Sequence, residues 1–122
     1  MIYTGYYAKV KKYEENGLTP IAVSGKVPDF FKGTVWKWLA PKWQSFSEWN
    51  NGEISDFQYA EMYEKEVLDK LDKEAFRELL IATKNPVLIC YEKPGDFCHR
   101  HIIADWIERN FGFIVEEYDF KG

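Results

Sequence analysis

The chain lacks the features that mark several large classes of protein. Only two of its 122 residues are cysteine and two are histidine, and no internal repeat or low-complexity linker is found. No apolar run approaches the roughly 20 residues of a membrane span, so we expect no membrane association. The first residues have no long apolar core behind a basic start, which argues against a signal peptide. Because two cysteines do not make a disulfide scaffold, we expect a cytoplasmic protein with reduced thiols.

The composition favours one folded domain. Hydrophobic residues make up 46% of the chain and aromatic residues 18%, which argues against disorder. The length suits a single α/β domain over residues 1–122, with one core. The net charge of −4 gives a field that favours neither nucleic acid nor anionic membranes.

Short apolar segments alternate with helical patterns along the chain. Residues 25–41, which prolines and glycines interrupt, are expected to be irregular. Asp72 and Asp96 are predicted N-caps. The predicted strands are residues 2–7, 21–24, 87–91 and 114–118, and the predicted helices are residues 8–16, 43–49, 55–71, 73–84 and about fourteen residues from 97. This order predicts a three-layer α/β fold: a mainly parallel sheet of about four strands with helices on both faces.

Sheets of this kind place binding sites at the carboxyl ends of their strands. The strand at 87–91 is the most apolar, so we expect it to be central and covered on both faces. The candidate binding residues at strand ends are Thr4, Tyr6, Ser24, Lys26 and Cys90.

Both cysteines and both histidines lie within residues 90–101. With Asp96 as N-cap, Cys98 would be the second residue of a helix, where unpaired N–H groups and the helix dipole favour a thiolate. Arg100 adds positive charge, and the same groups would bind a phosphate or carboxylate. The alternative is that Cys98 is a small buried apolar residue and that Arg100 pairs with a structural acid.

Redox and metal interpretations of this segment are less favoured. The spacing of Cys90 and Cys98 is not Cys-x-x-Cys, and a cysteine buried in a strand is mostly inert. Cys98, His99 and His101 would project from a helix with neighbours about 100° apart, which makes them poor ligands for one ion. We therefore expect no metal and no other cofactor.

Two residues are candidates for moving protons. His99 adjoins the cysteine, and Glu92 stands just past a strand end, where an acid would act as a general base or hold a ribose hydroxyl. The alternatives are a hydrogen-bonded or surface histidine and a solvated acid in a turn.

Residues 24–43 combine positive charge with aromatic side chains. Four lysines and one aspartate give this segment a net charge of +3, whereas the rest of the chain carries −7. Lysines among aromatics are suited to gripping phosphates and stacking bases, so Trp36 and Trp38 are candidate binding residues and loop 25–43 a candidate lid. The alternative is a loop packed down by its own aromatics, with solvated lysines.

One signature resembles a known family. Its C-terminal part consists of Cys90-Tyr-Glu92-Lys-Pro94, Cys98-His99-Arg100 and Ala104-Asp105-Trp106. These residues resemble the signature of the domain-of-unknown-function family 488, and the upstream half resembles its short branch. The upstream matches are Ser24-Gly25, Pro28, Gly33 and Leu39-Ala40-Pro41-x-Trp43. The resemblance implies a compact three-layer α/β fold and no established reaction.

The leading hypothesis is a small protein that binds an anionic ligand, a nucleotide or a nucleic-acid end, at the start of the last helix. Arg100 and the helix N–H groups would hold the anion, Cys98 would act as nucleophile, and His99 or Glu92 would handle protons. The alternative is a non-catalytic binding or regulatory module in which the Cys-His-Arg triplet is structural. The sequence leaves open whether the chain is an enzyme and what its oligomeric state is.

Overall fold

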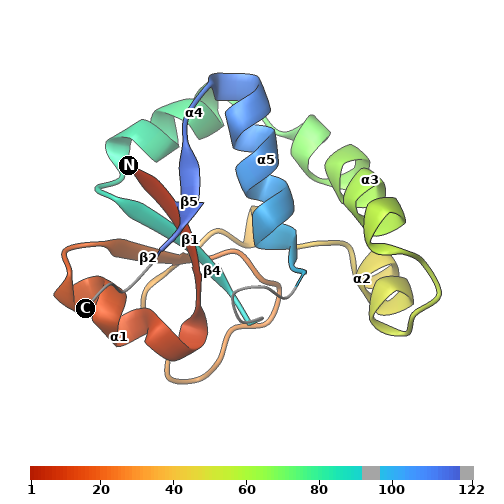
Figure 1. The fold of residues 1–122 in the computed structure, drawn as a ribbon, viewed down its shortest axis with the longest axis horizontal. Coiled ribbons are helices and arrows are strands. Elements are labelled where there is room, and N and C mark those ends of the chain that lie inside the picture. The colour runs from red at the N-terminus through yellow and green to blue at the C-terminus, as the bar shows by residue number, and fades with distance from the viewer. Residues whose placement is uncertain (92–96, 119–122) are drawn as a thin grey trace.

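A computed structural model describes residues 1–91 and 97–118 of the chain. Five strands form one parallel sheet in the order β3-β2-β4-β1-β5. Figure 1 labels β1, β2, β4 and β5 of this sheet. The strands are β1 (Ile2–Tyr6), β2 (Thr19–Ala22), β3 (Thr34–Val35), β4 (Pro86–Cys90) and β5 (Val115–Glu117). The predicted parallel sheet is confirmed, with five strands in place of about four. The additional strand is β3, which consists of two exposed residues inside the segment expected to be irregular.

Strand β4 occupies the centre of the sheet. It pairs with β1 on one side and with β2 on the other, and all five of its residues are buried. A strand covered on both faces cannot alternate apolar with polar residues, which explains its continuous apolar sequence. The prediction of a central, fully buried strand is confirmed.

Helices cover both faces of the sheet, as the sequence predicts. The helical segments are η1 (Tyr7–Lys9), α1 (Val10–Glu15), η2 (Lys37–Leu39), α2 (Trp43–Asn50), α3 (Asp56–Glu66), η3 (Leu68–Lys70), α4 (Lys73–Ala82) and α5 (His99–Phe111). On one face α1 packs through Val10 and Tyr13 against Val87 and Ile89 of β4. On the other face α3, α4 and α5 form the larger core with Leu88.

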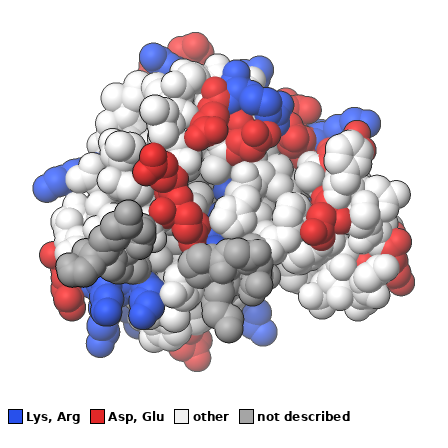
Figure 2. Space-filling view, in the orientation of Figure 1, with Lys and Arg blue, Asp and Glu red and all other residues white. Residues whose placement is uncertain are grey.

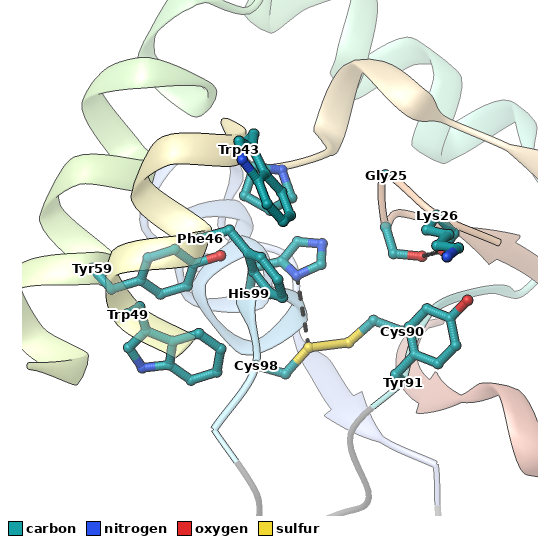
Figure 3. A pocket seen from close by; sticks show the side chains of 12 residues that line it. Gly25, Lys26, Trp43, Phe46, Trp49, Tyr59, Cys90, Tyr91, Cys98 and His99 are labelled. Carbon is teal, nitrogen blue, oxygen red and sulfur yellow. Dashed lines mark hydrogen bonds between the residues drawn. A yellow bond between two sulfur atoms is a disulfide. The ribbon is translucent and has the colours of Figure 1, made fainter. Parts of the chain in front are cut away.

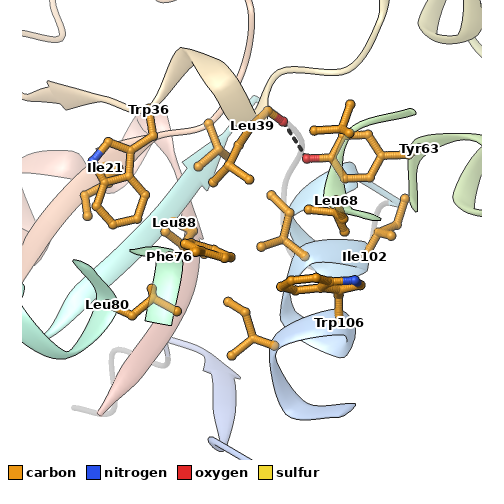
Figure 4. Packing of buried hydrophobic residues seen from close by; sticks show 14 of the residues in the cluster. Ile21, Trp36, Leu39, Tyr63, Leu68, Phe76, Leu80, Leu88, Ile102 and Trp106 are labelled. Carbon is orange, nitrogen blue, oxygen red and sulfur yellow. Dashed lines mark hydrogen bonds between the residues drawn. The ribbon is translucent and has the colours of Figure 1, made fainter. Parts of the chain in front are cut away.

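The larger core is rich in aromatic side chains (Figure 4). Phe76 of α4 and Trp106 of α5 lie with their ring centroids 5.9 Å apart. The Tyr63 hydroxyl of α3 donates a hydrogen bond to the Leu39 carbonyl, which lies at the end of η2. This bond ties the segment between β2 and α2 to the core, because both partners are buried.

Side-chain caps fix two of the helix starts. Ser55 and Gln58 form a reciprocal capping box at α3, and the Asp72 carboxylate accepts from the Ala75 N–H at α4. At α5 the structure differs from the prediction, because the N-cap is Cys98, in extended backbone. Cys98 is therefore not the second helical residue, and the predicted cap Asp96 lies outside the described residues.

The described surface carries mixed charge. Figure 2 shows acidic and basic side chains interspersed on one face, with uncharged surface between them. This distribution accords with the small net charge of −4. Within the described ranges, no helix combines the length and the apolar character that crossing a bilayer requires.

Candidate functional site

A pocket of about 400 Å³ opens where β2 and β4 end and α5 begins (Figure 3). This is the carboxyl edge of the sheet, where parallel sheets place their sites. The residues that line the pocket are Ser24, Gly25, Lys26, Pro41, Trp43, Phe46, Trp49, Tyr59, Cys90, Tyr91, Cys98 and His99. Its size is within the range of small-molecule sites.

The two sides of the pocket differ in chemistry. Aromatic side chains from α2 and α3 form one side, where the rings of Trp49 and Tyr59 stack at 4.8 Å with an interplanar angle of 12°. Gly25, Lys26 and Tyr91 lie opposite them in Figure 3, with the two sulfurs between. A planar, partly apolar molecule with one polar group matches these two sides.

The two cysteines are joined in the pocket wall. Cys90 at the end of β4 and Cys98 at the start of α5 form a disulfide, with their Cα atoms 7.5 Å apart. The expectation of reduced thiols is therefore wrong for this structure. The sequence separation did not predict the bond, because the bond depends on where the start of α5 lies relative to the end of β4.

His99 has a defined tautomer. Its Nε2 lies 2.7 Å from the Val23 carbonyl oxygen, which can only accept, so Nε2 carries the proton. Burial, together with the neighbouring charge of Arg100, lowers the pKa of His99 to about 4. The ring is thus neutral near pH 7, and its Nδ1 lone pair faces Cys98 Sγ at 3.7 Å.

Arg100 lies behind the pocket, fully buried. Its guanidinium donates to both carboxylate oxygens of Glu117 in β5, and its Nη1 donates to Cys90 Sγ at 3.1 Å. Thr4 donates to the same carboxylate. The geometry agrees with the alternative in which Arg100 pairs with an acid, and it places a cation beside one of the sulfurs.

Three potential metal ligands converge on the pocket. Cys90 Sγ, Cys98 Sγ and a nitrogen of His99 all lie within 4.8 Å of one another. The geometric objection to a shared ion does not hold for Cys98 and His99, because Cys98 has extended backbone and its side chain is not set by helical spacing. Thiolate and imidazole are ligands that zinc prefers, and they bind it only when the sulfurs are reduced.

The residues predicted from strand ends fall into two groups. Ser24, Lys26 and Cys90 line the pocket. The Ser24 hydroxyl also bonds to the Tyr7 hydroxyl at 2.6 Å and donates to the Lys26 carbonyl. Thr4 contributes behind the pocket through Glu117, and Tyr6 at the end of β1 is not among the described lining residues. Glu92 lies outside the described residues.

The tryptophans at the pocket are not those predicted. Trp36 is buried and stacks on Trp38, and both rings contact Phe76 of α4, away from the pocket lining. The missed residues are Phe46, Trp49 and Tyr59. A spacing of three along α2 puts Trp43, Phe46 and Trp49 close together, and this pattern was a usable signal.

The segment from 25 to 43 is anchored by its own apolar side chains. Phe31 packs in the core beneath α1, and Trp36 and Leu39 pack in the larger core. Lys26, Lys32, Lys37 and Lys42 are exposed. These contacts agree with the packed alternative for this segment.

Comparison with known proteins identifies the family. A family model described as the active DUF488-N3 subclade, DUF488-N3a, matches residues 8–111. No curated protein and no solved structure gives a significant match. The match spans the pocket helices, the central strand and the whole Cys-His-Arg segment, in a fold of the kind that the resemblance implied. The chain therefore belongs to the DUF488 family.

Proposed function

We propose that this chain binds a small, planar, anionic ligand in the pocket, and that the reduced Cys98 thiol attacks it as a nucleophile. The observation that carries this proposal is the contact of Cys98 Sγ with the unprotonated Nδ1 of His99, 3.7 Å away. A nucleophile and a base of suitable tautomer, held at the wall of a ligand-sized cavity, are the minimum that nucleophilic catalysis needs.

The ligand class is supported by the lining of the pocket. The stacked rings of Trp49 and Tyr59 offer an apolar surface to a flat ring. Lys26 is the only lysine or arginine among the described lining residues, and it lies on the opposite side. A nucleobase stacked on the aromatic side, with its phosphate towards Lys26, would use both sides of the pocket. A nucleotide or a nucleic-acid end is therefore the proposed ligand class.

In the proposed reaction, His99 Nδ1 accepts the proton of the Cys98 thiol. This proton transfer occurs as Cys98 Sγ bonds to an electrophilic atom of the ligand. The bond between that atom and its leaving group then breaks, Nδ1 gives the proton to the departing group, and the rest of the ligand stays bonded to Cys98 Sγ. The carbonyl of Val23 holds Nε2–H throughout and keeps the ring oriented. A cytoplasmic location is part of the proposal, because thiol reductants there would supply the reduced cysteine.

Alkylation of a single thiol tests the nucleophile. In the Cys90→Ser protein, iodoacetamide should label Cys98 about tenfold faster at pH 7 than in the same chain unfolded in urea. His99→Gln should remove this advantage, because the glutamine amide can replace the Nε2–H bond to Val23 but offers no imidazole base. His101→Gln, which alters the half-buried neighbour, should leave the rate unchanged. Labelling of Cys98 at the unfolded rate would contradict the proposal.

Binding is tested separately with adenosine monophosphate as the probe and uncharged adenosine as its control. Tryptophan fluorescence should report binding, since Trp43 and Trp49 line the pocket. Lys26→Ala should weaken binding of the monophosphate more than that of adenosine, whereas Lys32→Ala should change neither. Equal weakening of both compounds would exclude Lys26 as the partner of the anion.

A second candidate function is a binding module without catalysis. The buried Arg100–Glu117 pair favours it, because Arg100 is engaged in the interior rather than turned towards a ligand. In this case Cys98→Ser should retain both ligand affinity and the cellular effect of the protein. Loss of the cellular effect with affinity retained would favour the nucleophile.

A further inference from the structure

Both cysteines of the disulfide line the same pocket. Cys90 and Cys98 are nevertheless each at most 2% exposed. In the part of the chain that the structure describes, a molecule reaches these sulfurs through the pocket, whose volume of about 400 Å³ admits a small molecule and not a folded domain.

The surroundings of the two sulfurs differ. Cys90 Sγ accepts a hydrogen bond from the Arg100 guanidinium at 3.1 Å. Cys98 Sγ instead faces a neutral imidazole nitrogen. A cation that donates a hydrogen bond stabilises a thiolate, whereas a neutral imidazole that presents its lone pair offers the thiolate neither charge nor a donor. In thiol–disulfide exchange the sulfur whose thiolate is more stable leaves faster. Cys90 is consequently the better leaving group and Cys98 the sulfur to be attacked.

We propose that the Cys90–Cys98 pair is a thiol–disulfide exchange centre for low-molecular-weight thiols, in which Cys98 carries the mixed disulfide and Cys90 is the leaving and resolving thiolate. This inference rests on the proposed function for the reactivity of Cys98, and it adds a substrate class and a role for Cys90.

The exchange occurs in two balanced steps. A substrate thiolate attacks Cys98 Sγ, a substrate–Cys98 disulfide forms, and the bond to Cys90 breaks. The electron pair stays on Cys90 Sγ, beside Arg100. A second substrate thiolate then attacks the substrate sulfur of the mixed disulfide, which releases the substrate disulfide and leaves Cys98 as a thiolate. Two substrate thiols are oxidised and one protein disulfide is reduced; the reverse sequence oxidises the protein.

The opposite direction gives a simple way to trap the intermediate. In reduced protein, Cys98 attacks the probe glutathione disulfide, and Cys90 then displaces glutathione from the adduct. The Cys90→Ser protein should therefore accumulate glutathione on Cys98. The wild-type protein should instead lose the mass of two hydrogens without an adduct.

The asymmetry of the pair is tested by the matched variant Cys98→Ser. Its Cys90 should form the adduct at least about tenfold more slowly than Cys98 does in Cys90→Ser, because the imidazole base and the pocket geometry serve Cys98. In a protein that keeps both cysteines, Arg100→Met should slow reduction of the disulfide by dithiothreitol about tenfold, because the leaving Cys90 thiolate loses its neighbouring cation. Circular dichroism shows whether Arg100→Met folds. If it does not fold, the comparison of Cys98→Ser with Cys90→Ser still tests the proposal.

Three results would overturn the exchange centre: equal adduct formation on the two cysteines, a stable adduct in the wild-type protein, or two thiols that stay reduced in excess glutathione disulfide. Failure of the proposed function is read separately, from iodoacetamide labelling of the same Cys90→Ser sample. Fast alkylation without trapping overturns the exchange alone, whereas slow alkylation overturns the nucleophile as well.

Discussion

Arg100 of α5 and Glu117 of β5 form a two-pronged ion pair behind the pocket. Nε and Nη2 of the arginine each lie 3.2 Å from a different oxygen of the carboxylate. The arginine side chain is completely buried, and the glutamate side chain is 25% exposed. Because the same guanidinium contacts Cys90 Sγ, the pair links the edge strand β5 to the cysteine at the end of the central strand.

Replacing Glu117 with Leu should lower the free energy of unfolding by about 3 kcal/mol, because it leaves a buried cation without this carboxylate. Urea denaturation measures the change. Arg109→Ala is the control: its side chain is 50% exposed and pairs with Glu64 and Asp105, so its loss should cost about 1 kcal/mol or less. Equal costs for the two variants would mean that the buried pair adds nothing beyond a surface one.

Stability should depend on pH through His99. The pKa of His99 is lowered from 6.5 to about 4 in the folded protein, so the unfolded chain binds the extra proton first. The contribution of His99 to the free energy of unfolding is fully present above pH 6.5. It is lost as the pH falls towards 4, and the total loss is about 3 kcal/mol.

The measurement is urea denaturation at several pH values within this window. His99→Gln should flatten the dependence relative to wild type. Burial also lowers the pKa of His101, so His101→Gln should remove a smaller part with the same sign. A wild-type slope that His99→Gln leaves unaltered would show that the ring titrates normally.

Gly5 of β1 should tolerate no side chain. A Cβ built there would overlap the phenol of Tyr13, whose hydroxyl accepts a hydrogen bond from the Tyr6 N–H. Gly5→Ala should therefore lower the free energy of unfolding by about 1–3 kcal/mol. Gly25→Ala is the matched control, because its Cβ would meet only the Ala40 Cβ at an ordinary 3.6 Å. A fully stable Gly5→Ala protein would show that α1 shifts freely against the sheet.

Tyr63→Phe should loosen the chain around η2. The variant removes the donor to the Leu39 carbonyl and leaves that carbonyl buried, which costs about 1–3 kcal/mol. Hydrogen exchange should report faster opening of residues 36–41, with smaller changes in β4. Uniform acceleration across the sheet would instead mean that the bond supports the whole fold.

Local sequence patterns predicted much of the fold. The continuous apolar sequence of β4 and the cap at Asp72 report on neighbours close in the chain, and both are confirmed. Strand β3 escaped prediction because two exposed residues carry no apolar alternation. Its pairing with β2 is set by the path of the intervening loop.

The pocket contains only part of the predicted set of site residues. Of the residues chosen from strand ends, Ser24, Lys26 and Cys90 line the pocket. The partners of Cys98, His99 and Arg100 depend on how α5 lies against β4, β5 and the residue after β2, which no local pattern encodes. Trp49 and Tyr59 were assigned only to helices, since an amphipathic pattern does not show whether a face meets the core or a cavity.

The strand order also constrains how the chain can fold during synthesis. Strands β1 and β2 are made before the other strands of this sheet, yet they are not neighbours. Each pairs with β4, which is made more than sixty residues later. Until residues 86–90 leave the exit tunnel, the sheet has no centre, and both early strands have open edges that invite pairing with other chains. Strand β4, which joins β1 to β2, also carries Cys90, so the pocket can assemble only after β4 and the start of α5 exist.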